Sequence, residues 1–187
     1  IYINEKISIP LIFHNIFDKL VNFIDKNNLH LNYNTKTVKS TGDKISLPTG
    51  FTTSDKYAVD TYTIDDGVLV KKMISIHPDT NIKKIIIANK RGFKGTFIEC
   101  EKLGLTGNHK YYIVGDKLDL LISIFNFKII NIIANNIKYG QSFLDSEAFT
   151  YIPDIRKLNI DAITEEQFYK MINLTKEEID LIDKFGK

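Results

Sequence analysis

The long apolar stretch after Gly115 constrains the fold more than any other feature of this 187-residue chain. Between Lys117 and Lys138, large apolar residues recur at helical spacing and form one stripe: Leu118, Leu121, Ile122, Phe125, Ile129, Ile132 and Ile133. Polar residues interrupt the stretch: Asp119, Asn126, Lys128, Asn131, Asn135 and Asn136. Each charge at mid-bilayer costs about 2.5–3.5 kcal/mol. We therefore expect one long helix buried in a soluble core, and no membrane span.

The first half of the chain is mainly β-like. "IYINEKISI" alternates as a strand does and ends before Pro10, and an amphipathic helix is expected from Leu11 to Lys26. Residues 32–56 are polar and predict a long loop or a strand pair with an irregular connection. Two β-rich runs flank a turn at Asp66 and Gly67, which predicts a hairpin. The run "IKKIIIAN" predicts a strand buried on both faces.

The end of the chain predicts one short extended segment and two helices. "FTYIPDI" is expected to be extended and to stop at Pro153. Two capping boxes mark helix starts, Thr164 with Gln167 and Thr175 with Glu178. The predicted fold class is α+β: a mixed or antiparallel sheet with a long buried helix and short C-terminal helices. Residues 1–80 are expected to belong to the same domain as residues 81–187.

Composition excludes several classes of protein. The net charge of +2 does not predict an overall cationic nucleic-acid binder, so any basic patch is local. The single cysteine, Cys100, excludes an internal disulfide and favours a reducing, cytoplasmic location. The four histidines have no metal-ligand spacing, so no metal site is expected. Because the chain begins with Ile1, we expect it to be a fragment of a longer protein.

No catalytic motif is visible. The chain has no glycine-rich cofactor loop and no nucleophile with an evident histidine partner. Carboxylates that could gather a metal for a nuclease are Asp60, Asp65, Asp66, Glu99 and Glu101. Turn positions and a solvent-facing strand side explain them better, and a nuclease stays an alternative. No catalytic residue is assigned.

Three short stretches combine glycine with cationic or polar side chains: "NKRGFKG" at residues 89–95, "GNHKYY" at residues 107–112 and "IKYGQSF" at residues 137–143. Glycine lets a backbone approach a ligand closely, and Lys, Arg, Asn and His donate hydrogen bonds to phosphates and bases. Each stretch alone is more typical of a solvated turn. Lys128, Asn131, Asn135 and Lys138 are further expected to form one polar stripe on the long helix.

The order of these pieces resembles a known family. "KIIIANKRG", "GLTGNHKYYIVG", "LLISIFNFKIINIIANN" and "YGQSFLDSEAFTYIPDI" follow one another between Lys83 and Ile155. This order is similar to the C-terminal specificity, or target recognition, domain of Taq-type adenine-N6 DNA methyltransferases and type II restriction–modification enzymes. The resemblance covers the second half of the chain. The chain departs from the family at "NFK" (residues 126–128), where "NSK" is usual.

The resemblance implies sequence-specific binding of double-stranded DNA, beside a methyltransferase catalytic domain in cis. The Asn/Asp-Pro-Pro-Tyr/Phe catalytic motif is absent here, so S-adenosylmethionine is expected for the parent enzyme and no cofactor for this chain. Lys90, Lys94 and Lys110 would contact phosphates. Arg91, Asn108, His109 and Gln141 would read bases. The full set of candidate DNA-binding residues is Lys90, Arg91, Gly92, Lys94, Asn108, His109, Lys110, Lys138, Gln141 and Ser142.

Two alternatives from other classes stay open. A metal-dependent nuclease would use the carboxylates named above. A protein-interaction module without a nucleic-acid role would use the apolar helix or the two C-terminal helices.

Overall fold

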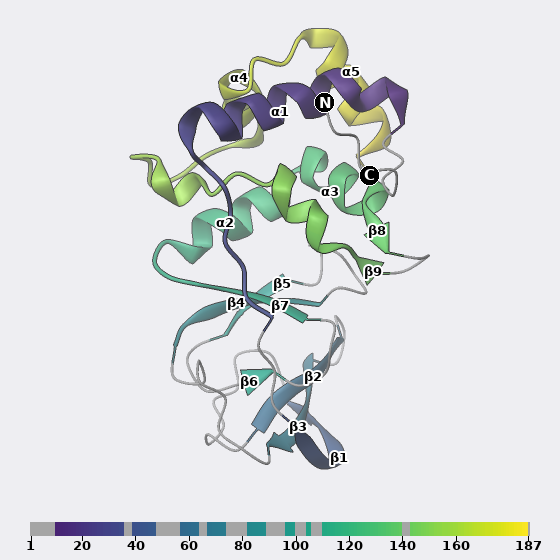
Figure 1. The fold of residues 1–187 in the computed structure, drawn as a ribbon, viewed down its shortest axis with the longest axis vertical. Coiled ribbons are helices and arrows are strands. Elements are labelled where there is room, and N and C mark those ends of the chain that lie inside the picture. The colour runs from purple at the N-terminus through teal and green to yellow at the C-terminus, as the bar shows by residue number, and fades with distance from the viewer. Residues whose placement is uncertain are drawn as a thin grey trace. The chain divides into compact units, whose positions relative to one another are not determined.

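The computed structural model describes residues 10–35, 39–47, 57–63, 67–73, 82–88, 96–99, 104–105, 110–139 and 143–186. Its fold class is α+β, as the sequence predicts. The described chain forms two compact units (Figure 1). The helical unit comprises the residues up to Asn32 and those from Asp119 onward. The sheet unit comprises Tyr33–Asn89 and Gly95–Leu118.

Helix α1 (His14–Asn27) opens the helical unit and confirms the amphipathic helix predicted there. A short 3-10 helix, η1 (Leu11–Phe13), precedes it. Four apolar side chains of α1 are buried: Ile16, Phe17, Leu20 and Ile24. The helix ends at Asn28, which has a left-handed φ of 52° and donates its backbone N–H to the carbonyls of Asp25 and Ile24. Asparagine tolerates this conformation better than most residues, so it can end the helix here.

The expected long helix is two helices, so the prediction of a single helix is wrong. Helix α2 (Leu118–Phe125) and helix α3 (Lys128–Asn136) are bent by 72° at the break between them. Asn126 donates its side-chain amide to the carbonyl of Ile122 at 2.9 Å, and its backbone N–H bonds three residues back. Phe127 is then extended (φ −69°, ψ 143°) and starts α3 in a new direction.

The expectation of a buried core segment is correct despite the break. Six consecutive residues of α3, from Ile129 to Ala134, are buried. Helix α3 packs against helix α5 (Lys176–Phe185) and against the 3-10 helix η3 (Ser146–Tyr151). In the described part of the chain, no single helix has the length and apolar content to cross a membrane, although α2 and α3 pass that test together as a bent pair.

The segment after α3 is less extended than the sequence predicts. Strands β8 (Lys138–Tyr139) and β9 (Phe143–Leu144) form an antiparallel pair, and η3 (Ser146–Tyr151) follows. The predicted extension of "FTYIPDI" is therefore wrong for its first three residues. The cause is local, because the carboxylate of Asp145 accepts the backbone N–H of Glu147 at 3.0 Å and starts a helical turn. Extended backbone begins only at Ile152, before Pro153 pairs with His30 and η4 (Ile155–Lys157) follows.

The two predicted capping boxes are both present, and each starts a helix. Helix α4 (Glu165–Met171) follows Thr164, whose hydroxyl accepts the N–H of Gln167 at 3.2 Å while the Gln167 side chain accepts the N–H of Thr164 at 2.8 Å. Helix α5 (Lys176–Phe185) begins with the same reciprocal pair. Each box satisfies two backbone donors that a helix start leaves unpaired.

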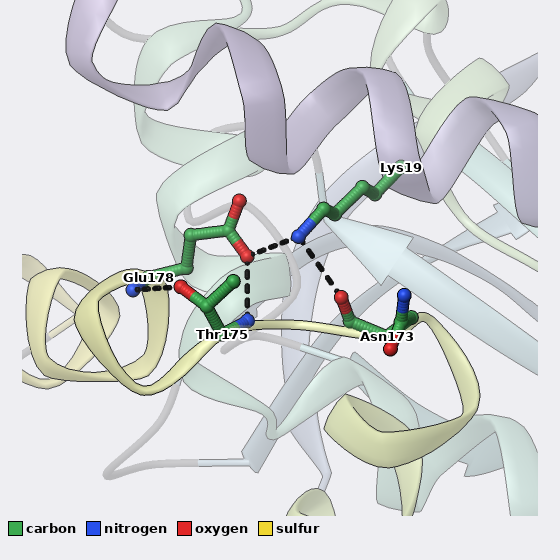
Figure 2. Close-up of polar contacts among 4 residues, drawn as sticks. All are labelled: Lys19, Asn173, Thr175 and Glu178. Atoms are coloured by element: carbon green, nitrogen blue, oxygen red, sulfur yellow. Dashed lines mark hydrogen bonds and ion pairs between the residues drawn. The ribbon is translucent and has the colours of Figure 1, made fainter.

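One capping residue also holds α1. The Glu178 carboxylate accepts the backbone N–H of Thr175 at 2.7 Å and the ammonium of Lys19 at 2.6 Å, as Figure 2 shows. Lys19 also donates to the carbonyl of Asn173 at 2.9 Å. The Lys19 side chain is 29% exposed and that of Glu178 is 15% exposed. Because this pair is partly withdrawn from water, it is worth more than an ordinary surface ion pair.

Replacing Glu178 by alanine is expected to lower the free energy of unfolding by about 2–3 kcal/mol, because both the cap and the contact with Lys19 are lost. Gln167→Ala, which removes the corresponding cap of α4, is the matched control and should cost about 0.3–1.5 kcal/mol. Urea unfolding of both variants makes the comparison. Equal losses would show that Lys19 contributes nothing through Glu178.

Helices α3, α4 and α5 meet around Lys128, the first residue of α3. Its backbone N–H donates to the Glu165 carboxylate, and its ammonium lies 2.5 Å from the Asp183 carboxylate. The Tyr169 hydroxyl donates to the same Glu165 oxygen at 2.6 Å. Burial raises the pKa of Tyr169, and the hydrogen bond to Glu165 raises it further. The start of α3 is thus fixed by two carboxylates, which suit the positive end of a helix dipole.

Gly186 ends α5 directly against Lys128. A Cβ atom added at Gly186 would lie 2.5 Å from the Cβ of Lys128 and 2.8 Å from the carbonyl oxygen of Ile182. The φ of Gly186 is −85°, which any residue adopts. Glycine is therefore required here for space and not for backbone conformation.

Gly186→Ala is expected to lower the free energy of unfolding by about 1–3 kcal/mol through this overlap. At a site with the same φ and enough space for a methyl group, Gly→Ala would stabilise the protein by about 0.4–1 kcal/mol. Thermal or urea unfolding shows whether Gly186→Ala raises or lowers the free energy of unfolding. Lys128→Gly removes the overlap with the Lys128 Cβ but not that with the Ile182 carbonyl, so adding it should relieve part of the loss. Lys128→Ala keeps the Cβ and should relieve none of it. A stabilised Gly186→Ala variant would contradict the packing described here.

The sheet unit contains two sheets. The first has the order β1-β3-β2-β6, with β1 (Ser40–Leu47), β2 (Tyr57–Thr63), β3 (Gly67–Met73) and β6 (Gly104–Leu105). Strands β2 and β3 are antiparallel with Thr63 opposite Gly67, which confirms the predicted hairpin. Strand β1 pairs with β3, so residues 32–56 contribute a strand to this sheet.

The second sheet has the order β5-β4-β7, with β4 (Lys84–Ala88), β5 (Thr96–Glu99) and β7 (Lys110–Val114), and both pairs are antiparallel. The strand predicted for residues 1–9 lies outside the described residues, as does the predicted domain division at residues 80 and 81.

Candidate nucleic-acid interface

Strand β4 is the buried centre of the three-stranded sheet. Ile85, Ile86 and Ile87 each have no exposed surface, which confirms a strand covered on both faces. Burying one isoleucine side chain contributes about 1.5–3 kcal/mol. On the neighbouring strand β7, Tyr112 and Ile113 are buried as well. The sheet therefore provides a firmly packed base for the segments that leave its ends.

The strand registers bring two of the three candidate stretches to one end of this sheet. Ala88, the last residue of β4, lies opposite Lys110, the first residue of β7. Ile87 lies opposite Thr96, the first residue of β5. Ala88, Thr96 and Lys110, which border the segments 89–95 and 106–109 in the sequence, therefore lie at the same end of the sheet. We call this end the basic end of the sheet.

Backbone pairing fixes β7 on its outer side as well. Asn34 and Tyr112 exchange two backbone hydrogen bonds, at 2.8 and 3.0 Å. The rings of Tyr33 and Tyr111 meet edge to face, with centroids 5.3 Å apart. Lys110 therefore begins a strand that is held along both edges, by β4 and by the chain at Asn34.

The opposite end of the sheet also carries a lysine. Lys84 begins β4, is fully buried, and donates its ammonium to the carbonyl of Ile82 at 2.7 Å. In the strand register it lies opposite Glu99 of β5 and Val114 of β7. This lysine belongs to the packed interior, so it is no candidate for a phosphate contact.

Positive charge is concentrated in the middle of the sequence. Between Tyr33 and Leu118 there are 14 Lys and Arg residues against 9 Asp and Glu, a net charge of +5. The rest of the chain has 11 against 14, a net charge of −3. The overall charge of +2 conceals this division, which a local charge count could have revealed from the sequence alone.

Most of the candidate DNA-binding residues lie outside the described residues. Two are placed by their backbone: Lys110 is the first residue of β7, and Lys138 is the first residue of β8. Strands β8 and β9 form a hairpin with Tyr139 opposite Phe143. That hairpin belongs to the helical unit. Outside the described residues are Lys90, Arg91, Gly92, Lys94, Asn108, His109, Gln141 and Ser142.

The polar stripe expected on the long helix is wrong. Lys128 is bonded to Asp183, and Asn131 is 92% buried, with its amide 3.3 Å from the carbonyl of Phe127. Lys128 and Asn131 are therefore occupied by contacts within the protein. Asn135 is exposed, but Lys138 lies beyond α3 in strand β8, so the four residues do not form one polar face of a helix.

The helical unit hides one arginine that the sequence did not single out. Arg156 forms a two-pronged contact with Asp154, at 2.7 and 2.8 Å, and both side chains are largely buried. Lys157 next to it donates to the backbone carbonyls of Asn28 and His30, at the end of α1. Both cations therefore have structural roles.

The carboxylates considered for a nuclease are not brought together where the structure describes them. Asp60 belongs to β2 in the four-stranded sheet and Glu99 to β5 in the three-stranded sheet, whereas Asp65, Asp66 and Glu101 lie outside the described residues. Within the described ranges, no group of three His, Cys, Asp or Glu side chains could hold a metal ion.

Comparison with known proteins adds no assignment. No family model matches the chain, and no curated protein or solved structure is significantly similar to it. The resemblance to target recognition domains therefore stays a prediction from the sequence.

Proposed function

We propose that this chain binds double-stranded DNA in a sequence-specific manner, as the target recognition domain of an adenine-N6 DNA methyltransferase of the restriction–modification type. The observation that carries the proposal is the strand register, in which Ala88 lies opposite Lys110 and Ile87 lies opposite Thr96. It gives the segments 89–95 and 106–109 a common end of one sheet. Those segments contain Lys90, Arg91, Lys94, Asn108 and His109.

The basic end of the sheet suits both parts of DNA recognition. Lysines there replace counterions along the phosphate backbone, which provides affinity that does not depend on sequence. Arg91 has the planar fork that pairs with the O6 and N7 atoms of guanine, and Asn108 suits the N6 and N7 atoms of adenine. The net charge of +5 between Tyr33 and Leu118 favours this middle part of the sequence as the DNA-binding part.

The chemistry of methyl transfer is assigned to a catalytic domain in cis. That domain would bind S-adenosylmethionine and receive an adenine turned out of the base stack. This chain would grip the duplex beside the adenine. It contains neither the Asn/Asp-Pro-Pro-Tyr/Phe motif nor a glycine-rich cofactor loop, so no catalytic step is given to its residues.

Selection from a pool of random duplexes tests this function. The chain should enrich one defined sequence, and it should prefer that sequence over random duplex by about 10³-fold or more at moderate salt. Arg91→Ala should relax the choice at one position and cost about 1–3 kcal/mol on the preferred site. Labelled S-adenosylmethionine added to the same reactions should give no methyl transfer.

Other outcomes distinguish the alternatives. Cleavage of the duplexes that depends on a divalent metal would favour the nuclease. Failure to retain any duplex at low salt, together with a stable oligomer, would favour a protein-interaction module.

A further inference from the structure

We draw no further inference here: the strongest candidate, the exposed apolar cluster of Leu11 and Ile12 ahead of α1 with Phe185 at the end of α5, whose ring meets Phe13, carries none because nothing in the structure shows what covers it.

Discussion

Replacing Phe168 by alanine is expected to lower the free energy of unfolding by about 3–5 kcal/mol. Phe168 lies in α4 and has no exposed surface. Its ring meets Phe23 of α1 edge to face, with centroids 6.3 Å apart, and is tilted against Phe127 at 5.7 Å. The change leaves a cavity among α1, α4 and the start of α3, and it removes two aromatic pairs that contribute beyond their buried area.

Urea unfolding measures this loss as a shift of the midpoint at constant slope. The matched control is Phe185→Ala, because Phe185 is 48% exposed, and its ring meets Phe13 with centroids 5.8 Å apart. We expect Phe185→Ala to lower the free energy of unfolding by well under half as much as Phe168→Ala does. Similar losses in the two variants, or a loss below about 1 kcal/mol at Phe168, would contradict the packing of α4 against α1.

Elements that depend on nearby residues were predictable from the sequence. The two capping boxes each involve residues three apart, and both form as predicted. The hairpin of β2 and β3 and the helix α1 likewise follow from local periodicity and turn residues. In these segments, short-range hydrogen bonds and the burial pattern favour the same structure.

The break between α2 and α3 could not be predicted in the same way. Apolar spacing continues across Asn126 and Phe127 without a proline or glycine. At the end of α2, Asn126 donates to the Ile122 carbonyl, and the buried Phe127 packs against Phe168, 41 residues further along the chain. A contact over such a separation leaves no trace in local periodicity. The close approach of Gly186 to Lys128 is hidden for the same reason.

The residue types of the candidate interface could be predicted from the sequence, but the pairing of strands that brings its two segments to one end of a sheet could not. The stretches "NKRGFKG" and "GNHKYY" are recognisable as cationic, glycine-containing turns. Their common position depends on the pairing of Ala88 with Lys110, which joins strands 22 residues apart and follows from the sheet order β5-β4-β7. Strand register is fixed by burial of both faces of β4, and the sequence alone does not say which strand lies beside it.

The second large effect concerns DNA affinity and its dependence on salt. Lys90 and Lys94 belong to the segment that leaves the basic end of the sheet between Ala88 and Thr96. Each phosphate neutralised by a lysine contributes about −0.9 to the slope of log K against log salt concentration. Lys90→Ala combined with Lys94→Ala should therefore flatten the slope by up to about two units, equally on preferred and random duplexes.

A matched control separates this local effect from net charge. Lys170 and Lys176 are exposed lysines at the α4–α5 hairpin of the helical unit, so their double alanine variant loses the same two charges. Its slope and affinity should remain close to those of the unchanged chain. Substitution of the exposed Lys170 and Lys176 should leave stability within about 0.5 kcal/mol. Unfolding curves of both double variants show whether a change in affinity accompanies a loss of stability.

The most direct measurement is thus the slope of duplex affinity against salt concentration for the unchanged chain and the two double variants. The proposed function predicts a steep slope that flattens by up to about two units when Lys90 and Lys94 are replaced, and an unaltered slope when Lys170 and Lys176 are replaced. Identical slopes for all three proteins, or equal flattening in both variants, would contradict DNA binding at the basic end of the sheet.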